Sequence, residues 1–249
     1  MAGYKFLIDG QVPTAYCHQP HNGTSWDMPT WDPDNFKSVV RSLHDTGLQI
    51  CTHCVGDAAA DLALDAYEAA MNANPRSDPR HRLEHLVLTT SAATQRMRDL
   101  GVIASANPHF IYVAGDSYAN NFGENRIDRI IVTREWLDNG VHLTIGSDAP
   151  SVPFHHPQAT MAGGMSRLTF NKNVIGSDQC LTFSEALRAH TIEAAYAAHE
   201  ENIKGSLEPG KLADLVVWNE DPSRLRIGEL FATTTVAMTM VGGKIVHPA

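Results

Sequence analysis

The stretch LQICTHCVGDAAADLALDAYEAA, residues 48–70, sets the fold class of this chain. Its first seven residues form a short apolar run, which predicts a buried β-strand over 48–54. After Gly56 the pattern changes, and Leu62, Ala66 and Ala69 share one stripe of a predicted helix over 58–73. A strand followed directly by a helix is the beginning of a β-α-β unit, the crossover connection that parallel strands require.

The same alternation of strand and helix repeats along most of the chain. It predicts an α/β fold in which helices pack outside a parallel sheet. Further strands are predicted at 4–8, 81–88, 101–108 and 141–148, and further helices at 34–44, 91–100, 133–139, 160–167 and 183–199. Ser184 is the expected N-cap of the last helix. Residues 9–33 and 109–130 are predicted as polar loops.

The pattern changes again near residue 205. The stretches 213–218 and 235–246 predict antiparallel strands, with Gly242–Gly243 as a hairpin turn. We therefore expect an α/β domain at 1–205 and a small β appendage at 206–249.

Composition excludes several classes of function. Hydrophobic residues make up 43% of the 249 residues and charged residues 19%, as in ordinary globular proteins. The net charge of -9 argues against nucleic-acid binding, which needs a basic surface. No apolar run is long enough for a membrane span, and the N-terminus does not resemble a signal peptide. The four cysteines are too few for a disulfide framework, so reduced thiols and a cytoplasmic location are expected.

Polar residues at strand ends are the candidate functional residues. In α/β barrels the active site lies at the carboxyl ends of the strands, where His53, His85 and Asp148 are predicted. Imidazole and carboxylate groups suit zinc or a similar divalent ion. A bound ion would lower the pKa of its water toward roughly 7 and polarise a carbonyl. Asp148 could then pass the proton to a leaving amine, so the pattern predicts metal-assisted hydrolysis of an amide-like bond.

Each of these residues also has a simpler interpretation. A single strand histidine is more often structural than a ligand. His81 and His85, four residues apart, would suit zinc on a helix, but this stretch is predicted as a strand that begins at His81. Cys51 and Cys54 have CxxC spacing, although alternation along a strand places them on opposite faces. An unrelated enzyme with a cysteine nucleophile remains an alternative.

Several motifs together resemble a known family. The chain is similar to the amidohydrolase superfamily, and within it to the amidohydrolase family 3 branch that includes N-substituted formamide deformylases. The matching stretches are YKFLIDG (4–10), THCVGDAAADLALDAYE (52–68), RHRLEH (80–85), ASANPHF (104–110), TIGSDAP (144–150) and IKGSLEPGKLADLVVWNEDP (203–222).

The resemblance implies an architecture and an activity. The fold would be a partial TIM-type (β/α) barrel, strands four to eight, with a C-terminal β appendage from the family's β-sandwich. The expected activity is hydrolysis of carbon-nitrogen bonds in small amides or formamides. One or two divalent ions would be the cofactor, with zinc the expected metal.

The resemblance also assigns roles to individual residues. His53 and His85 match the metal-ligating histidines after barrel strands five and six. Asp148 matches the strand-eight aspartate that binds metal and transfers the proton. Lys5 stands where many members carry a carboxylated lysine that bridges two metals, or it is an ordinary strand lysine.

Three further residues receive secondary roles. Asp57 and Glu84 are expected to orient the histidines, or to form structural salt bridges. His109 is expected either to contact substrate or to be an ordinary loop residue.

One family motif is missing from the sequence. The strand-one His-x-His does not occur, so the sequence is expected to start at strand four. This leaves a sheet edge that a homo-oligomer could cover. The alternative function is a truncated, non-catalytic remnant or interaction module.

Overall fold

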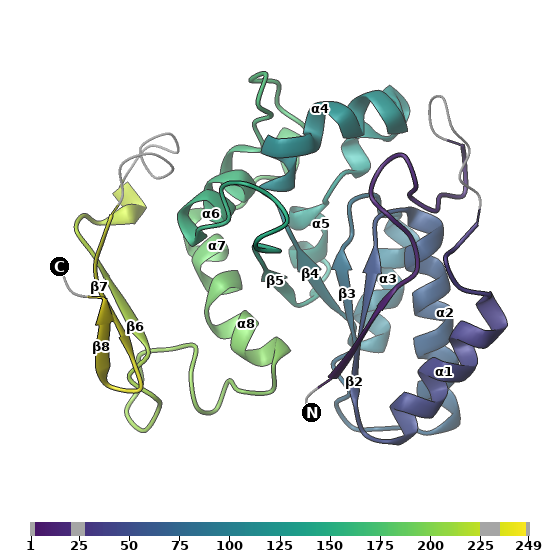
Figure 1. The fold of residues 1–249 in the computed structure, drawn as a ribbon, viewed down its shortest axis with the longest axis horizontal. Coiled ribbons are helices and arrows are strands. Elements are labelled where there is room, and N and C mark those ends of the chain that lie inside the picture. The colour runs from purple at the N-terminus through teal and green to yellow at the C-terminus, as the bar shows by residue number, and fades with distance from the viewer. Residues whose placement is uncertain (1–2, 21–27, 225–234, 248–249) are drawn as a thin grey trace.

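A five-stranded parallel sheet forms the centre of the molecule (Figure 1). The computed structural model describes residues 3–20, 28–224 and 235–247. The strands are β1 (Gly3–Leu7), β2 (Gln49–Cys54), β3 (Arg82–His85), β4 (Ile103–Ala106) and β5 (Leu143–Ile145). They lie in the order of the chain, and every neighbouring pair is parallel. The predicted α/β class is confirmed.

Helices connect the strands and cover the sheet. The connecting helices are α1 (Pro33–Asp45), α2 (Asp57–Ala73), α3 (Ser91–Leu100) and α5 (Thr133–Asp138). α1 packs on α2, and α2 on α3, along one face of the sheet (Figure 1). Thr52 of β2 hydrogen-bonds Tyr67 of α2 over 2.6 Å, which identifies the helix-facing side of the strand. Side chains alternate along a strand, so His53 points to the other face.

The predicted loop over 109–130 is wrong. This segment forms helix α4 (Phe110–Phe122) and a 3-10 helix, η1 (Glu124–Arg129). The buried residues Ile111, Gly115, Tyr118 and Phe122 follow a helical spacing. Polar residues between them, among them Ser117, made the segment look like a loop in the sequence.

The predicted helix over 183–199 is divided in two. Thr191 has φ -116° and ψ -92°, which separates α7 (Phe183–His190) from α8 (Ile192–Ala197). Thr182, not Ser184, is the N-cap, because it forms a capping box with Glu185. Both helices pack against β5. The remaining helices are α6 (Pro157–Ser166), where 160–167 was predicted, and the short η2 (Ser177–Gln179) and η3 (Pro222–Arg224).

A small antiparallel sheet follows, as predicted. It contains β6 (Leu215–Trp218), β7 (Val236–Val241) and β8 (Lys244–His247) and lies to one side of the molecule (Figure 1). Gly242 and Gly243 form the predicted turn, both with positive φ, which glycine adopts without strain. In the part of the chain that the structure describes, no helix is both long and apolar enough to cross a membrane.

Two buried histidines connect α1 to the sheet. The backbone N–H of Ile50 donates to His81 Nδ1, so His81 carries its proton on Nε2 and donates to His44 Nδ1 over 2.8 Å. His44 Nε2 in turn donates to the Asn74 carbonyl. Burial, with smaller contributions from His44 and Arg76, lowers the pKa of His81 to about 3. The network therefore requires a neutral His81 ring.

This network predicts a loss of stability in acid. The pKa of His81 in the unfolded chain, about 6.5, is above its value in the folded protein. The contribution of neutral His81 to the free energy of unfolding is therefore complete above pH 6.5 and falls between pH 6.5 and 3. At pH 5 protonation should cost about 2 kcal/mol. Chemical denaturation of His81→Gln between pH 6 and 4 should show a pH slope smaller by one proton, about 1.4 kcal/mol per pH unit.

The matched control is Val40→Ala, which removes a buried side chain of α1 but no ionisable group. It should lower stability and keep the wild-type slope. An unchanged slope in His81→Gln would contradict the assignment.

Candidate functional site

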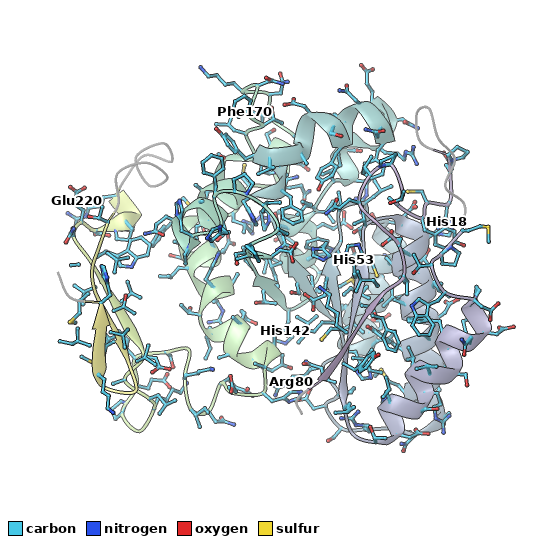
Figure 2. The ribbon with its side chains drawn as sticks, in the orientation of Figure 1. His18, His53, Arg80, His142, Phe170 and Glu220 are labelled. Atoms are coloured by element: carbon cyan, nitrogen blue, oxygen red, sulfur yellow. The ribbon has the colours of Figure 1, made fainter. Side chains whose placement is uncertain are left out.

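Four predicted site residues line one cavity at the carboxyl ends of the strands. The cavity has a volume of about 450 Å³, and Lys5, His53, His85 and Asp148 all contribute to its wall. His53 is labelled at the centre of Figure 2, near the ends of the sheet strands. Helix α4 contributes Phe110 and further residues to the same wall. The structure thus brings together residues that lie up to 143 positions apart.

His53 reaches the cavity because of its place in β2. It pairs in register with Leu7 of β1 and Glu84 of β3, on the face opposite the helices α1 to α3. Its residue surface is 8% exposed. Burial is the main cause that lowers its pKa to about 3, and the charges of His85 and Lys5 add to the effect. The ring is therefore neutral at pH 7 and can offer a lone pair.

His85 reaches the same cavity through an unusual backbone conformation. Alternation along β3 would place it on the helix-facing side with Leu83, but His85 has φ +74°, in the left-handed region. Its ring centroid lies 4.5 Å from that of His53. Such a conformation costs about 1 kcal/mol or more and is found mainly at functional sites.

A hydrogen bond fixes which nitrogen of His85 can bind a ligand. Asn107 donates its Nδ2 proton to the Gly146 carbonyl, so its Oδ1 faces His85 Nδ1 over 2.7 Å. His85 therefore carries its proton on Nδ1, and Nε2 keeps the lone pair. Burial lowers the pKa of His85, which keeps the ring neutral.

Asp148 lies beyond its strand. β5 ends at Ile145, so Asp148 stands in the following loop, exposed and with φ +51°. Ser151 donates its hydroxyl proton to Asp148 Oδ2 over 2.6 Å. Among the described residues, no three histidine, cysteine, aspartate or glutamate side chains converge closely enough to hold one ion. Two neutral imidazoles suit a divalent metal. Lys5 and Asp148, the other proposed ligands, line the same cavity.

Two residues of the site were missed in the sequence. Asn107 orients His85, and Asp9 lies beside His53, with Oδ1 3.5 Å from Nε2. Burial raises the pKa of Asp9 to about 7, although backbone N–H groups oppose this shift. Asp9 directly follows the predicted strand over 4–8, and Asn107 lies near the end of the predicted strand over 101–108. The strand-end criterion that selected His53 would also have selected them.

The three secondary candidates occupy different surroundings. Asp57 accepts hydrogen bonds from the backbone N–H groups of His18 and Ala58 at the start of α2. Glu84 accepts hydrogen bonds from Arg82 of its own strand and from Ser105 of β4.

His109 precedes α4 and is 2% exposed, and neither ring nitrogen has a hydrogen-bond partner of normal geometry in the described structure. Burial lowers its pKa to about 4, while the Ser147 carbonyl and Asp148 pull it upward. It lines a second cavity of about 410 Å³ between α4 and α6.

The cysteines are poor candidates for nucleophiles. All four thiols are free, and Cys51 and Cys54 are buried. Burial raises the pKa of Cys51 to about 11 and that of Cys54 well above its usual value. Both are therefore protonated at neutral pH, whereas nucleophilic attack requires a thiolate.

The parallel sheet and the polar residues at its strand ends define an α/β fold of the metal-dependent hydrolase type. A solved structure of this type, an uncharacterized metal-dependent hydrolase from Pyrococcus horikoshii, superposes with a TM-score of 0.79 at 26% identity, over 92% of this chain and 46% of that one. The sequence profile of the amidohydrolase family matches residues 2–247. The chain belongs to the amidohydrolase family.

Two curated proteins are also similar in sequence. The N-substituted formamide deformylase of Arthrobacter pascens is 33% identical over 91% of this chain and 42% of its own length. The protein LONG AFTER FAR-RED 3 of Arabidopsis thaliana is 30% identical over 100% of this chain and 43% of its own length. The chain thus spans less than half the length of these relatives.

Proposed function

We propose that the protein is a metal-dependent hydrolase of carbon-nitrogen bonds in small non-peptide amides or formamides. The observation that carries this proposal is the pair of neutral imidazoles, His53 and His85, that face each other on the wall of a cavity that Asp148 also lines. The similarity to a formamide deformylase supports the bond type.

Each residue has a definite role in this proposal. His53 and His85 hold one divalent ion, which we propose to be zinc, and Lys5 is the proposed further ligand on β1. A bound ion supplies Lewis acidity and lowers the pKa of a water molecule. Asp148 takes up a proton at its carboxylate and returns it to the departing amine. Ser151 holds Oδ2 of Asp148, which leaves Oδ1 for this transfer.

The experiment combines metal analysis with a substrate panel. Freshly purified protein, never exposed to chelator, should contain about one equivalent of a divalent metal. It should release amine from N-alkyl formamides and other N-acyl amines. Asp148→Asn should keep more metal than a histidine variant but lose turnover. Protein without metal, or loaded protein inactive on the whole panel, would refute the proposal.

A non-catalytic binding role is the second candidate. It is favoured by one observation, that no three acidic, histidine or cysteine side chains among the described residues converge on one point. In that case the protein would bind amides or metal without turnover.

We also infer that the five parallel strands are strands four to eight of a (β/α) barrel. The sequential order β1 to β5 supports this assignment. β1 and β5 would then be the edges where the other barrel strands, or a second copy of the chain, pair.

A further inference from the structure

Asp9 is a buried acid beside the proposed metal site. Its side chain has 0% of its surface exposed. In the described part of the chain, no lysine or arginine lies within ion-pair distance of it, and the neutral His53 ring lies 3.5 Å away. A carboxylate in such a place is expensive to bury unless directed donors satisfy its oxygens.

Three backbone N–H groups provide those donors. Tyr16 and Gly56 donate to Oδ2 over 3.1 and 2.8 Å, and Val55 donates to Oδ1 over 3.0 Å. Val55 and Gly56 directly follow β2, so Asp9 fixes the backbone two and three residues after His53. The carboxylate is thereby held in one orientation.

The same contacts hold the wall of the cavity. The Tyr16 N–H anchors the loop after β1, which contributes Gln11 and Val12 to the cavity wall. This loop packs closely against the residues that follow β2. A Cβ on Gly56 would lie only 1.9 Å from the Tyr16 carbonyl oxygen. Asp9 therefore joins three parts of the site: the loop, the end of β2 and the His53 ring.

The orientation of His53 follows from this arrangement. Its Nε2 is buried, lies 3.5 Å from Asp9 Oδ1 and has no hydrogen-bond partner of normal length in the described structure. When Asp9 is ionised, its carboxylate oxygen at this distance favours a proton on the facing nitrogen. The lone pair then resides on Nδ1, the nitrogen that remains for the cavity.

We propose that Asp9 is a positioning residue that keeps the proton of His53 on Nε2 and holds the ring with Nδ1 available to a metal. The functional meaning rests on the proposed metal site, but the proton position is a property of the metal-free protein. Asn107 orients His85 in the same way, by accepting the proton of Nδ1 rather than that of Nε2. The two ligands would thus be prepared by two different side chains.

The first test is the proton position in the metal-free protein at pH 9, about two units above the pKa of about 7 that burial gives Asp9. Nitrogen-15 NMR of the imidazole rings, assigned with His53→Gln, should show His53 protonated on Nε2. In Asp9→Asn this preference should be lost or reversed, because the amide is uncharged and has one acceptor oxygen in place of the two in the carboxylate. His85 should stay protonated on Nδ1 in both proteins, as an internal control.

The second test is zinc affinity. Titration with Zn²⁺ alone should show a dissociation constant about 10- to 100-fold weaker for Asp9→Asn, the effect typical of residues that orient metal ligands. Asp9→Glu should recover part of the affinity. Asp116→Asn is the matched control, since Asp116 accepts hydrogen bonds from Thr169 and two asparagines outside the cavity.

The outcomes separate this inference from the proposed function. His53 protonated on Nδ1 in the wild type would overturn the inference. So would a folded Asp9→Asn protein with wild-type proton positions and wild-type zinc affinity. If Asp9→Asn does not fold, the wild-type spectrum and Asp9→Glu decide. If the wild type binds no zinc, the proposed function fails, and the NMR result alone still decides the role of Asp9.

Discussion

His85→Ala is expected to abolish tight zinc binding by this chain. The variant removes one of two facing imidazoles and leaves His53 without its partner. Structural zinc sites bind with about 10–16 kcal/mol over four ligands, so one ligand is worth roughly 3–4 kcal/mol. The dissociation constant should therefore rise roughly 100- to 1000-fold. Competition with a chromophoric chelator measures this change directly.

Graded variants make the result specific. Asn107→Ala keeps the His85 ring but removes the acceptor for its Nδ1 proton, so a smaller loss, about 10-fold, is expected. His142→Ala is the control, because His142 is a partly exposed histidine that pairs with Glu193. It should leave zinc affinity unchanged. If all three variants bind zinc like the wild type, the metal site lies elsewhere.

Arg167→Ala is expected to cause a large fall in the free energy of unfolding. Arg167 has 0% of its surface exposed and donates to three backbone carbonyls, those of Ile130, Ile131 and Ile175. These bonds join the segment after α6 to the segment before α5. Burial lowers the pKa of Arg167 to about 10, so the side chain stays charged at pH 7.

The size of the effect follows from the groups left behind. Each buried carbonyl without a donor costs about 1–3 kcal/mol, and a cavity adds to this. The variant no longer buries a charge, and the avoided desolvation cost offsets part of the loss. The free energy of unfolding should therefore fall by about 3–5 kcal/mol. At roughly 2–4 °C per kcal/mol, the melting temperature should fall by roughly 6–20 °C.

Two companions test the geometry of this interaction. Arg167→Lys keeps the charge but cannot direct donors to three carbonyls at once, so it should recover only a small part of the stability. Arg98→Ala removes a surface arginine that pairs with Asp99 and should change stability by less than about 1 kcal/mol. Equal melting temperatures for Arg167→Ala and wild type would contradict the assigned role.

Local patterns in the sequence predict the sheet and most helices well. The runs predicted as strands over 48–54 and 81–88 contain β2 and β3, although β3 ends at His85, and the stripe from Leu62 to Ala69 became part of α2. Such patterns succeed because hydrophobic periodicity reports directly on burial. They failed at α4, where polar residues hide the buried positions, and at Thr191, where one residue leaves the helical conformation.

The candidate site was only partly visible in the sequence. His53 could be placed, because its position in a regular strand sets the face on which it lies. His85 could not be placed by alternation, since its left-handed backbone turns the ring toward the cavity. Asp9 and Asn107 could have been selected by their positions at strand ends, but their roles depend on contacts with segments 46 and 22 residues away in the chain.

The sequence by itself therefore determined the fold class, the family resemblance and the identity of the candidate residues near the strand ends. Only the tertiary structure decided which of these residues meet and which nitrogen of His85 is left free. The reason is physical: periodicity and composition are local, whereas the direction of a side chain and its hydrogen-bond partners depend on segments that folding brings together. His53 and His85, 32 positions apart in the sequence, have ring centroids 4.5 Å apart.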